Sequence, residues 1–549
     1  MFEALISYGL LVPYFCLAIL ALRYYTHMLQ LSSYQFQGYF RVIRSEWKKV
    51  ACHIAFFVLF AAVFLLQIPT GIATVLLLVM LVLFIAMIIM YLPKKAKKKF
   101  VITGRVKRLF VTYAILTLLI FFVPSVVARA VAPGDEAMKY IYAVTARIVA
   151  GAAYVGILPF IAALANLINK PIEQRINQGF IDDAVRILKE HENLRIIGIT
   201  GSYGKTSVKY YLTTLLSEGF RVLMTPESYN TPMGIVRTIR EQMQPTHEIF
   251  VCEMGARHLH DIKEITDIVH PDDGIVTSIG YQHLETFHSL ENIISTKYEL
   301  LDAVDEKEKA EGGKKPGKHL KFVNGDNEII QKNMKYPDAI TYGLSEGCDY
   351  RAANLKVTGA GTTFTVTSPS GESAEYTTKL VGRHNVENIV GAIAAANSLG
   401  ISMTKLKMAV RRLQGVPHRL ELNKHGNVSI LDDAYNSNPN GAKVALETLA
   451  LFEGAVKILV TPGMVELGEK EDEYNMQFGA QAADVCDYII LVGDKNSASI
   501  KKGAEDAGFD PEKIFVKSTL NEATALMYEL DAGREKVILL ENDLPDNYK

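Results

Sequence analysis

Cysteine is scarce in this chain, which has five in 549 residues. They are Cys16, Cys52, Cys252, Cys348 and Cys486; no two form a CxxC pair, and two of them lie inside apolar runs. A disulfide-stabilised secreted fold has closely spaced, paired cysteines, so this pattern argues against one and favours reduced thiols. We therefore expect the soluble part of the protein in a reducing cytoplasm.

The chain also has almost no net charge. Its 58 Lys and Arg residues balance 59 Asp and Glu residues, which leaves a formal charge of -1. Such a chain has no overall field that attracts nucleic acid, so we expect no nucleic-acid partner. Its length excludes a single hydrophobic core, because domains usually hold about 100 to 200 residues, and predicts three or four structural units.

Long apolar runs are present only in the first third of the chain. The mean hydropathy of +0.14 is high for a soluble enzyme, and about 20 apolar residues are enough to cross a bilayer. We therefore predict an α-helical membrane domain over residues 1–170. The first run has no basic start and no small-residue cleavage site, so we expect no removable signal peptide; because it is short, a buried or interfacial helix remains an alternative. The five predicted spans are Leu5–Leu22, His53–Ile68, Ile72–Leu92, Leu109–Val127 and Ile148–Ile168.

Basic residues set the expected orientation of these helices. Arg23–Lys49 and Lys94–Arg108 are rich in Lys and Arg, and such loops stay in the cytoplasm. Five spans then place the N-terminus outside and everything after Lys170 inside, with the uncharged turn Gln67–Gly71 outside. Tyr24–Trp47 mixes aromatic and basic residues, which fits either an interfacial amphipathic helix or a plain loop.

A glycine-rich turn begins the globular part. Arg195–Thr200 has the pattern of a buried strand that leads into Thr200-Gly201-Ser202-Tyr203-Gly204-Lys205-Thr206-Ser207 and then a helix. Glycines let backbone N–H groups close around phosphate oxygens, Lys205 adds a positive charge, and the Thr206 hydroxyl can bind Mg²⁺. The glycine nearest to the position that a strict GxxxxGK loop requires is Gly198, one residue early. A tight strand-to-helix turn without nucleotide therefore stays an alternative.

The shortened form Thr-Gly-x-x-Gly-Lys-Thr/Ser resembles the phosphate loop of the Mur ligases, and further segments resemble that family in the same order. The resemblance runs from about Leu194 to Leu540. It implies a P-loop central ATP-binding domain at 194–414 and a Rossmann-like α/β C-terminal domain at 415–549. The short amphipathic stretch before them predicts a linker helix at 171–193. The matching segments are Glu253-Met254-Gly255-Ala256, Ile279–Glu285, Gly382–Asn388, Leu431–Pro439 and Thr461–Gly468.

The resemblance also implies an ATP-dependent peptide ligase and a role for each matching residue. Each has a plainer alternative: a lone histidine is more often structural, Lys297 alone is a surface lysine, and Asn324-Gly325 is an ordinary turn. The implied catalytic residues are Lys205, Lys297, His283 and Arg419. Those implied to bind ATP are Thr200, Gly201, Ser202, Gly204, Lys205, Thr206, Ser207, Asn324, Asp326, Asn388 and Arg419. The implied Mg²⁺ ligands are Thr206, Glu253, His283 and Lys297, the last as a CO₂-derived carbamate.

The most specific segment, Leu431–Pro439, resembles the branch of the family that adds D-alanyl-D-alanine. It implies a muramyl peptide as donor and D-Ala-D-Ala or a similar amine as acceptor. The expected membrane domain replaces that branch's uridine-binding domain, so both a UDP-linked and a lipid-linked donor remain open, as does an ATP-driven transport or scaffold protein. The residues implied on the acceptor side are Asp433, Tyr435, Asn436 and Asn438.

Overall fold

The computed structural model describes residues 12–65, 69–93, 99–313, 318–358, 361–416, 419–434, 438–465, 467–531 and 533–542. The described residues divide into two compact units, unit 1 up to Gln178 and unit 2 from Gly179 onward. The predicted order of apolar helices followed by α/β structure is the order that the structure has.

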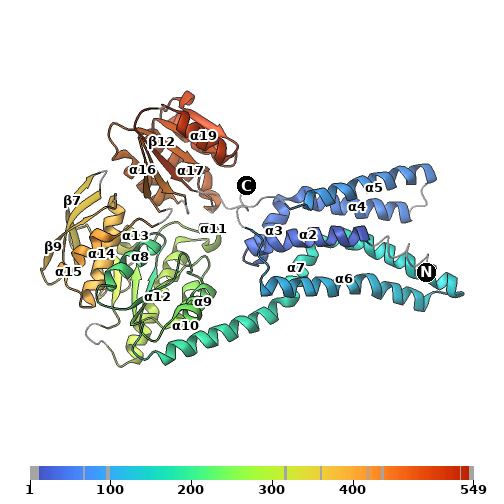
Figure 1. Ribbon diagram of the computed structural model, residues 1–549, viewed down its shortest axis with the longest axis horizontal. Helices are drawn as coiled ribbons and strands as arrows, with labels where there is room; N and C mark the ends of the chain where they lie inside the picture. Colours follow the sequence, from blue (N-terminus) through green and yellow to red (C-terminus); the bar gives the residue numbers. More distant parts are fainter. Residues whose placement is uncertain are drawn as a thin grey trace. The chain divides into compact units, whose positions relative to one another are not determined.

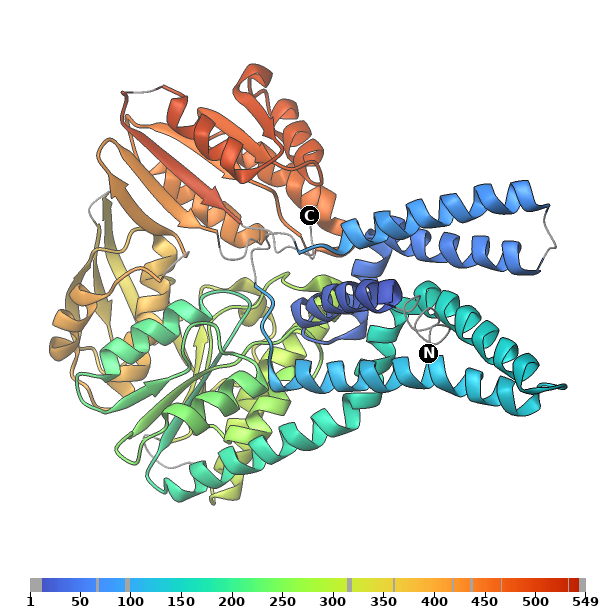
Figure 2. The same cartoon turned by 45° about the vertical axis from the view of Figure 1, so that its right-hand side comes forward.

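Unit 1 is helical. Two antiparallel helix pairs, α4 with α5 and α6 with the first part of α7, are visible in Figure 2. Helix α7 contains Pro159 and Pro171 and continues to Glu190, so the predicted boundary at residue 170 falls inside it and the predicted linker at 171–193 falls largely inside it. The helices are α2 (Val12–Leu31), α3 (Phe36–Ser45), α4 (Trp47–Leu65), α5 (Thr70–Tyr91), α6 (Gly104–Val131) and α7 (Glu136–Glu190).

Four helices among the described residues are long and apolar enough to cross a membrane: α4, α5, α6 and α7. They cover most of four of the five predicted runs; residues 66–68 of the second run lie outside the described residues, and Leu92 follows α5. The first run, Leu5–Leu22, lies partly outside the described residues, and its described part belongs to α2, which is not one of the four. Among its described residues the structure therefore supports four apolar helices of spanning length, and the first predicted span stays a prediction.

A proline inside α7 creates a specific contact in unit 1. Pro159 has no N–H, so the carbonyl of Val155, four residues earlier, loses its helical hydrogen bond. His53 of α4 lies with Nδ1 2.8 Å from that carbonyl oxygen. Its Nε2 lies 2.8 Å from the Tyr91 hydroxyl, which is 2.7 Å from the Tyr25 hydroxyl. Because a carbonyl only accepts, neutral His53 donates through Nδ1 and accepts from Tyr91 through Nε2.

Unit 2 contains a nine-stranded sheet in the order β2-β3-β1-β4-β5-β6-β7-β8-β9. The side chains of β1 point alternately to the two faces of the sheet. Ile196 packs with α9, α10 and α12, whereas Ile197 and Ile199 pack with α8, α14 and α15. Helices therefore cover both faces of the sheet (Figure 1). The strands are β1 (Arg195–Thr200), β2 (Val222–Met224), β3 (Ile249–Glu253), β4 (Asp273–Val276), β5 (Lys321–Asn324), β6 (Ile340–Gly343), β7 (Tyr350–Thr358), β8 (Gly361–Thr367) and β9 (Ser373–Thr378).

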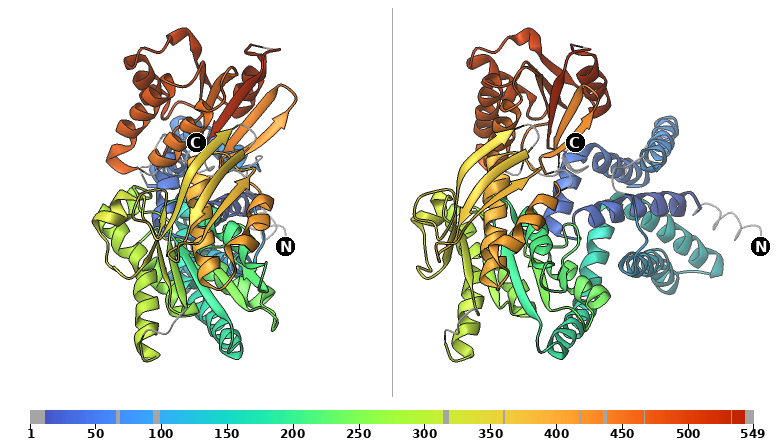
Figure 3. Two further views of the ribbon diagram at one scale, coloured as in Figure 1. Left: turned by 90° about the vertical axis from the view of Figure 1, so that its left-hand side faces the viewer. Right: turned by 60° about the vertical axis from the view of Figure 1, so that its left-hand side comes forward.

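Strands β1 to β7 pair in parallel, whereas β8 and β9 pair antiparallel at the edge. Figure 3 shows this yellow edge beside the orange helices α14 and α15. The helices of this part are α8 (Lys205–Leu216), α9 (Pro232–Gln242), α10 (Asp261–Val269), α11 (Leu284–Phe287), α12 (Leu290–Ala310), α13 (Glu328–Lys332), α14 (Arg383–Ser398) and α15 (Met403–Arg412).

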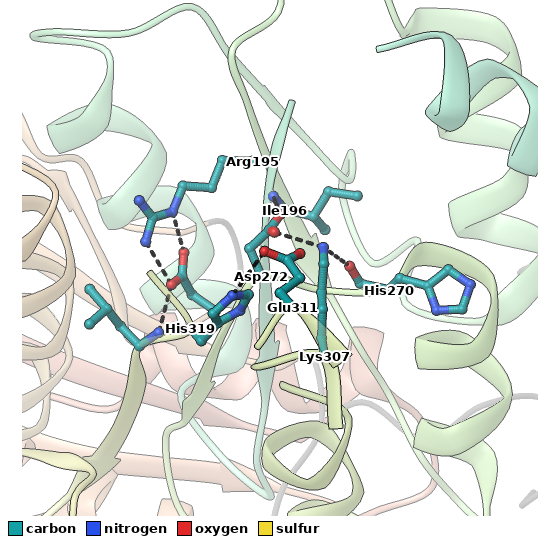
Figure 4. Close-up of polar contacts among 9 residues, drawn as sticks. Arg195, Ile196, His270, Asp272, Lys307, Glu311 and His319 are labelled. Carbon is teal, nitrogen blue, oxygen red and sulfur yellow. Dashed lines mark hydrogen bonds and ion pairs between the residues drawn. The ribbon is translucent and has the colours of Figure 1, made fainter. Parts of the chain in front are cut away.

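The amino ends of the parallel strands carry a network of charged residues (Figure 4). Arg195, at the start of β1, donates two hydrogen bonds to Asp273 of β4, at 2.6 and 2.8 Å. Asp272 accepts from the Ile196 N–H at 2.8 Å and pairs with Lys307 at 2.7 Å. These carboxylates therefore align β1, β4 and α12 at the edge opposite the glycine-rich turn.

The second sheet of unit 2 has the order β10-β11-β15-β12-β13-β14, parallel except for the β10–β11 pair. It is the α/β C-terminal part that the sequence predicted. Its strands are β10 (Glu421–His425), β11 (Val428–Asp433), β12 (Val456–Thr461), β13 (Tyr488–Val492), β14 (Ile514–Lys517) and β15 (Lys536–Glu541). Its helices are α16 (Pro439–Ala450), α17 (Glu471–Ala483), α18 (Ser497–Asp506) and α19 (Leu520–Glu529), with short 3₁₀ turns η1 (Gly468–Lys470) and η2 (Pro511–Lys513).

Candidate active site

The glycine-rich turn joins the end of β1 to the start of α8. Gly201 has φ +153° and Gly204 has φ +78°, conformations that other residues rarely adopt. A Cβ on Gly201 would lie 2.2 Å from Thr277 Oγ1, and one on Gly204 would lie 2.5 Å from Asn388 Oδ1. Both positions thus require glycine. Gly198 is a packing residue instead, because its Cβ would lie 2.5 Å from Leu300 of α12.

The segment after β4 holds this turn in place. The Ser202 N–H donates to Ser278 O at 2.7 Å, and the Tyr203 N–H donates to Ser278 Oγ at 2.8 Å. The Gly280 N–H donates to Ser202 Oγ at 3.0 Å, and Thr277 Oγ1 donates to the Tyr203 carbonyl. The loop therefore has a fixed shape before any ligand binds.

Lys205 begins α8 and folds back over the turn. Its Nζ donates to the Gly201 carbonyl and, at 3.2 Å, to the Ser202 carbonyl. Burial lowers its pKa to about 8, against the opposing effect of the nearby Glu253 carboxylate. An ammonium held only by neutral carbonyls is suited to an anion, because phosphate oxygens would replace weak acceptors with charged ones.

Glu253 ends β3, beside β1, and is almost completely buried. Its Oε1 accepts from Thr206 Oγ1 at 3.0 Å and from Asn230 Nδ2 at 3.1 Å. Positive charges on Lys209 and Lys205 lower the pKa of this carboxyl group although burial alone would raise it. A hydroxyl and an ionised carboxylate side by side at the helix start are hard oxygen donors that fit one Mg²⁺, whose remaining ligands would be water and phosphate oxygens.

Lys209 is a residue of this site that the sequence did not reveal. It lies one turn after Lys205 on the same face of α8, and its Nζ is 3.0 Å from Glu253 Oε2, with both side chains at most 1% exposed. It also donates to the Glu227 carbonyl in the loop after β2. The spacing of four residues from Lys205 was the only signal, and it becomes informative only when β3 is known to be adjacent.

Lys297 lies in α12 and is buried, with 3% exposure. Burial lowers its pKa well below the usual value, the charge of Lys205 lowers it further, and Asp261 and Glu299 oppose the shift. As an amine, Lys297 is not a suitable ligand for a metal cation, whereas a carbamate on the same nitrogen would be.

His283 precedes α11 with φ +54°. No three His, Cys, Asp or Glu side chains in the described part of the chain are placed to hold a metal ion.

The other residues implied to bind ATP lie in several different elements of unit 2. Asn388 of α14 lies against Gly204, so the structure brings it to the phosphate loop. Asn324 ends β5 and accepts from the Asp326 N–H at 2.8 Å. Asp326 accepts from the Leu344 and Ser345 N–H groups at 2.7 and 2.8 Å, which holds the turn after β6. Thr200 Oγ1 donates to Met254 O at 2.9 Å, and Ser207 lies in the first turn of α8.

Residues of the C-terminal part reach the same region. The charge of Arg419 contributes to lowering the pKa of Lys205 and opposes the burial that raises the pKa of Asp433 to about 6. Arg419 is therefore close to both groups. Asn438 caps α16, accepting from the Gly441 N–H at 2.8 Å. Tyr435 and Asn436 lie outside the described residues.

Comparisons with known proteins match this architecture. The family profile of the Mur ligase middle domain matches residues 199–396, and that of the Mur ligase glutamate ligase domain matches residues 418–541. The chain belongs to the Mur ligase family. As a Mur ligase it is a peptide ligase, and the two matched ranges contain the phosphate loop and Asp433.

Two relatives of this Mur ligase carry the name UDP-N-acetylmuramoyl-tripeptide--D-alanyl-D-alanine ligase. The Escherichia coli protein is 29% identical over 348 residues, 61% of this chain and 74% of the relative. The Bacillus subtilis protein is 32% identical over 313 residues, 56% of this chain and 65% of the relative. The chain therefore spans about two thirds to three quarters of these relatives.

Solved structures show the same fold. MurF from Acinetobacter baumannii matches with a TM-score of 0.59 and 23% identity, over 67% of this chain and 77% of that one. MurF from Thermotoga maritima in complex with ADP matches with a TM-score of 0.58 and 24% identity, over 67% of this chain and 80% of that one. At these identities the likeness concerns the fold.

Proposed function

We propose that this Mur ligase uses ATP to join D-Ala-D-Ala, or a closely related amine, to the carboxylate of a muramyl peptide. The single observation that carries the proposal is the convergence of a preformed phosphate loop, the Thr206–Glu253 pair and Arg419 at the carboxyl ends of β1 and β3. Ligands bind at this edge of parallel sheets. The names of the relatives supply the substrates.

The proposed chemistry begins with the donor carboxylate attacking the γ-phosphorus of ATP, which releases ADP and forms an acyl phosphate. The acceptor amine then attacks the acyl carbon, loses a proton and displaces phosphate, leaving the amide. Lys205 and the loop N–H groups hold the phosphates, and Arg419 neutralises the transferred group. Mg²⁺, held by Thr206 and Glu253, would screen the charge between the phosphate and the carboxylate.

The state of Lys297 supports its proposed conversion to a carbamate. CO₂ reacts with a neutral amine, and burial beside Lys205 favours the neutral form of Lys297 by lowering its pKa. The carbamate would replace a buried neutral amine by an anion close to the Lys205 ammonium. His283 is proposed as a further ligand of a second Mg²⁺ at that position.

We assign the four apolar helices to a membrane, with unit 2 in the cytoplasm. A membrane-confined donor would meet the enzyme at a raised effective concentration, so a lipid-linked muramyl peptide is the donor that gives unit 1 a role. The uridine-linked donor named for the relatives is the alternative.

The test uses the full-length protein in detergent with ATP, Mg²⁺ and D-Ala-D-Ala, and offers either the UDP-muramyl tripeptide or its lipid-linked equivalent. Amide product is followed by mass spectrometry, with Lys205→Ala as the inactive control. Product from the UDP substrate makes unit 1 a localisation device, and product from the lipid substrate alone makes it part of substrate selection. Phosphate release without any amide contradicts the proposed acceptor and favours an ATP-driven transport protein.

A further inference from the structure

Helix α3 and the first turn of α4 carry aromatic and basic side chains on one exposed surface. The inner face of α3 is fixed to unit 1 by Tyr39, which is fully buried and donates from its hydroxyl to Pro159 O at 2.6 Å. Val42, one turn on, is 7% exposed. The outer face therefore has a defined direction. Phe36 at its start packs partly against the core, whereas Phe40, Arg44, Trp47 and Lys48 are exposed.

That outer face exposes large rings. Phe40 is 45% exposed and Trp47 is 61% exposed. In a protein surrounded by water, burying such large rings is strongly favourable. Phe36 and Phe40 stack on each other along α3, with ring centroids 6.3 Å apart. Aromatic rings held outward beside charged groups are typical of the headgroup level of a bilayer, where one side is apolar and the other wet.

The charge of the same segment has one sign. Residues 36–49 contain Arg41, Arg44, Lys48 and Lys49 against Glu46, a net charge of +3. Lys49 is used internally, where it donates to the Tyr24 hydroxyl at 2.9 Å, whereas Arg44 and Lys48 are exposed. Such outward cations complement anionic phosphate headgroups, and each one near an anionic surface strengthens binding about fivefold.

The position of Trp47 connects this surface to the apolar helices. Trp47 is the first residue of α4, and the candidate span of α4 begins at the same residue. Apolar side chains follow from there, while the basic residues lie at or before its first turn. The aromatic and basic surface is thus continuous with the place where a span would enter the hydrocarbon.

We propose that the surface formed by Phe40, Arg44, Trp47 and Lys48 binds the headgroups of anionic phospholipids at the cytoplasmic leaflet. This inference rests on the proposed membrane location and adds a lipid class to it. It predicts that anionic lipid draws the rings of Phe40 and Trp47 into the interface, because Arg44 and Lys48 lie beside them.

The chain has a single tryptophan, so its intrinsic fluorescence reports on Trp47 alone. The full-length protein is placed in nanodiscs of phosphatidylcholine with increasing phosphatidylglycerol, and quenching by lipids brominated at different depths is measured. We expect a blue shift with anionic lipid, strongest quenching by bromine nearest the headgroup, and reversal by salt. Equal emission in neutral and anionic discs, or Trp47 as open to iodide as in detergent, overturns the proposal.

Two variants sharpen the test. Arg44→Gln with Lys48→Gln should abolish the dependence on phosphatidylglycerol, a loss of about 25-fold in local affinity if the two charges act independently. Arg186→Gln with Lys189→Gln removes two basic residues from the end of α7 in unit 2 and should leave the response unchanged. If both pairs have the same effect, the response is general electrostatics and the proposed surface is wrong. Removal of the protein from membranes by a carbonate wash is a separate result, which contradicts the membrane location itself.

Discussion

Lys209 and Glu253 form an ion pair that is closed off from solvent, with Nζ 3.0 Å from Oε2. The other carboxylate oxygen, Oε1, is left to Thr206 and Asn230. Mg²⁺ is usually held by one carboxylate oxygen at a time. Lys209 therefore holds Glu253 in an orientation that presents a single oxygen to the phosphate loop.

Lys209→Met should destabilise unit 2 by roughly 3 to 5 kcal/mol, because it leaves a buried carboxylate without its partner. It should also weaken Mg²⁺-dependent ATP binding, measured by calorimetry on the purified protein. Lys209→Arg keeps the charge and should recover part of both losses. Lys209→Met combined with Glu253→Leu should recover stability without ATP binding; a double variant no more stable than Lys209→Met would contradict the buried-pair explanation.

Gly201→Ala should abolish ATP binding and lower the melting temperature. The backbone conformation alone costs about 1 to 3 kcal/mol for a residue with a side chain, and the new Cβ would lie 2.2 Å from Thr277 Oγ1. Gly426→Ala is the matched control, because Gly426 also has a positive φ, +63°, with nothing within 4 Å of a built Cβ. It should cost about 1 kcal/mol and leave ATP affinity unchanged. Equal effects of the two substitutions would show that steric contact with Thr277 is unimportant.

Glu387 should make the protein less stable as the pH rises. Burial, followed by the charge of Asp326, raises its pKa from 4.5 to about 7, although Arg383 opposes the shift. Between these values the folded state holds a proton that the unfolded state has released, so the free energy of unfolding falls through this window by about 3 kcal/mol. Glu387→Gln should remove that part of the fall. Melting temperatures at pH 5 and pH 8 test this: an unchanged difference in the variant would assign the effect to another group.

His53 and Pro159 should be energetically coupled. His53→Leu leaves the Val155 carbonyl without a partner, at a cost of about 1 to 3 kcal/mol. In a Pro159→Ala background the new N–H can bond to that carbonyl, so the same substitution should cost at least about 0.5 kcal/mol less. Thermal unfolding of the four proteins in one detergent gives the coupling energy. Additive effects would mean that His53 stabilises unit 1 through Tyr91 alone.

The phosphate loop was predictable from sequence because its residues are consecutive and its glycines have a local steric cause. The strand before it and the helix after it followed from the same short segment. The apolar helices α4 to α7 were predictable for a similar reason, since length and composition are local properties. The first predicted run, Leu5–Leu22, differs because only its second part, in α2, lies among the described residues.

Contacts that depend on strand order were not predictable. Lys209 meets Glu253 because β3 lies beside β1, and no spacing in the chain encodes that neighbourhood. Asn388 reaches Gly204 across 184 positions of sequence, which only the resemblance to Mur ligases suggested. The cap formed by Asn438 is a local feature with its own structural explanation, so its predicted place on the acceptor side stays a prediction.

The support that Thr277–Gly280 gives to the glycine-rich turn has a consequence for how this motif can be used. Hydrogen bonds with Thr277, Ser278 and Gly280 fix the turn from outside its own eight residues. Grafting Thr200–Ser207 alone between a strand and a helix of another protein would transfer the amino-acid sequence of the turn without its backbone conformation. The smallest unit that keeps this conformation contains the neighbouring ends of β1 and β4 with the segments that follow them. A designed nucleotide site would therefore have to include both strands.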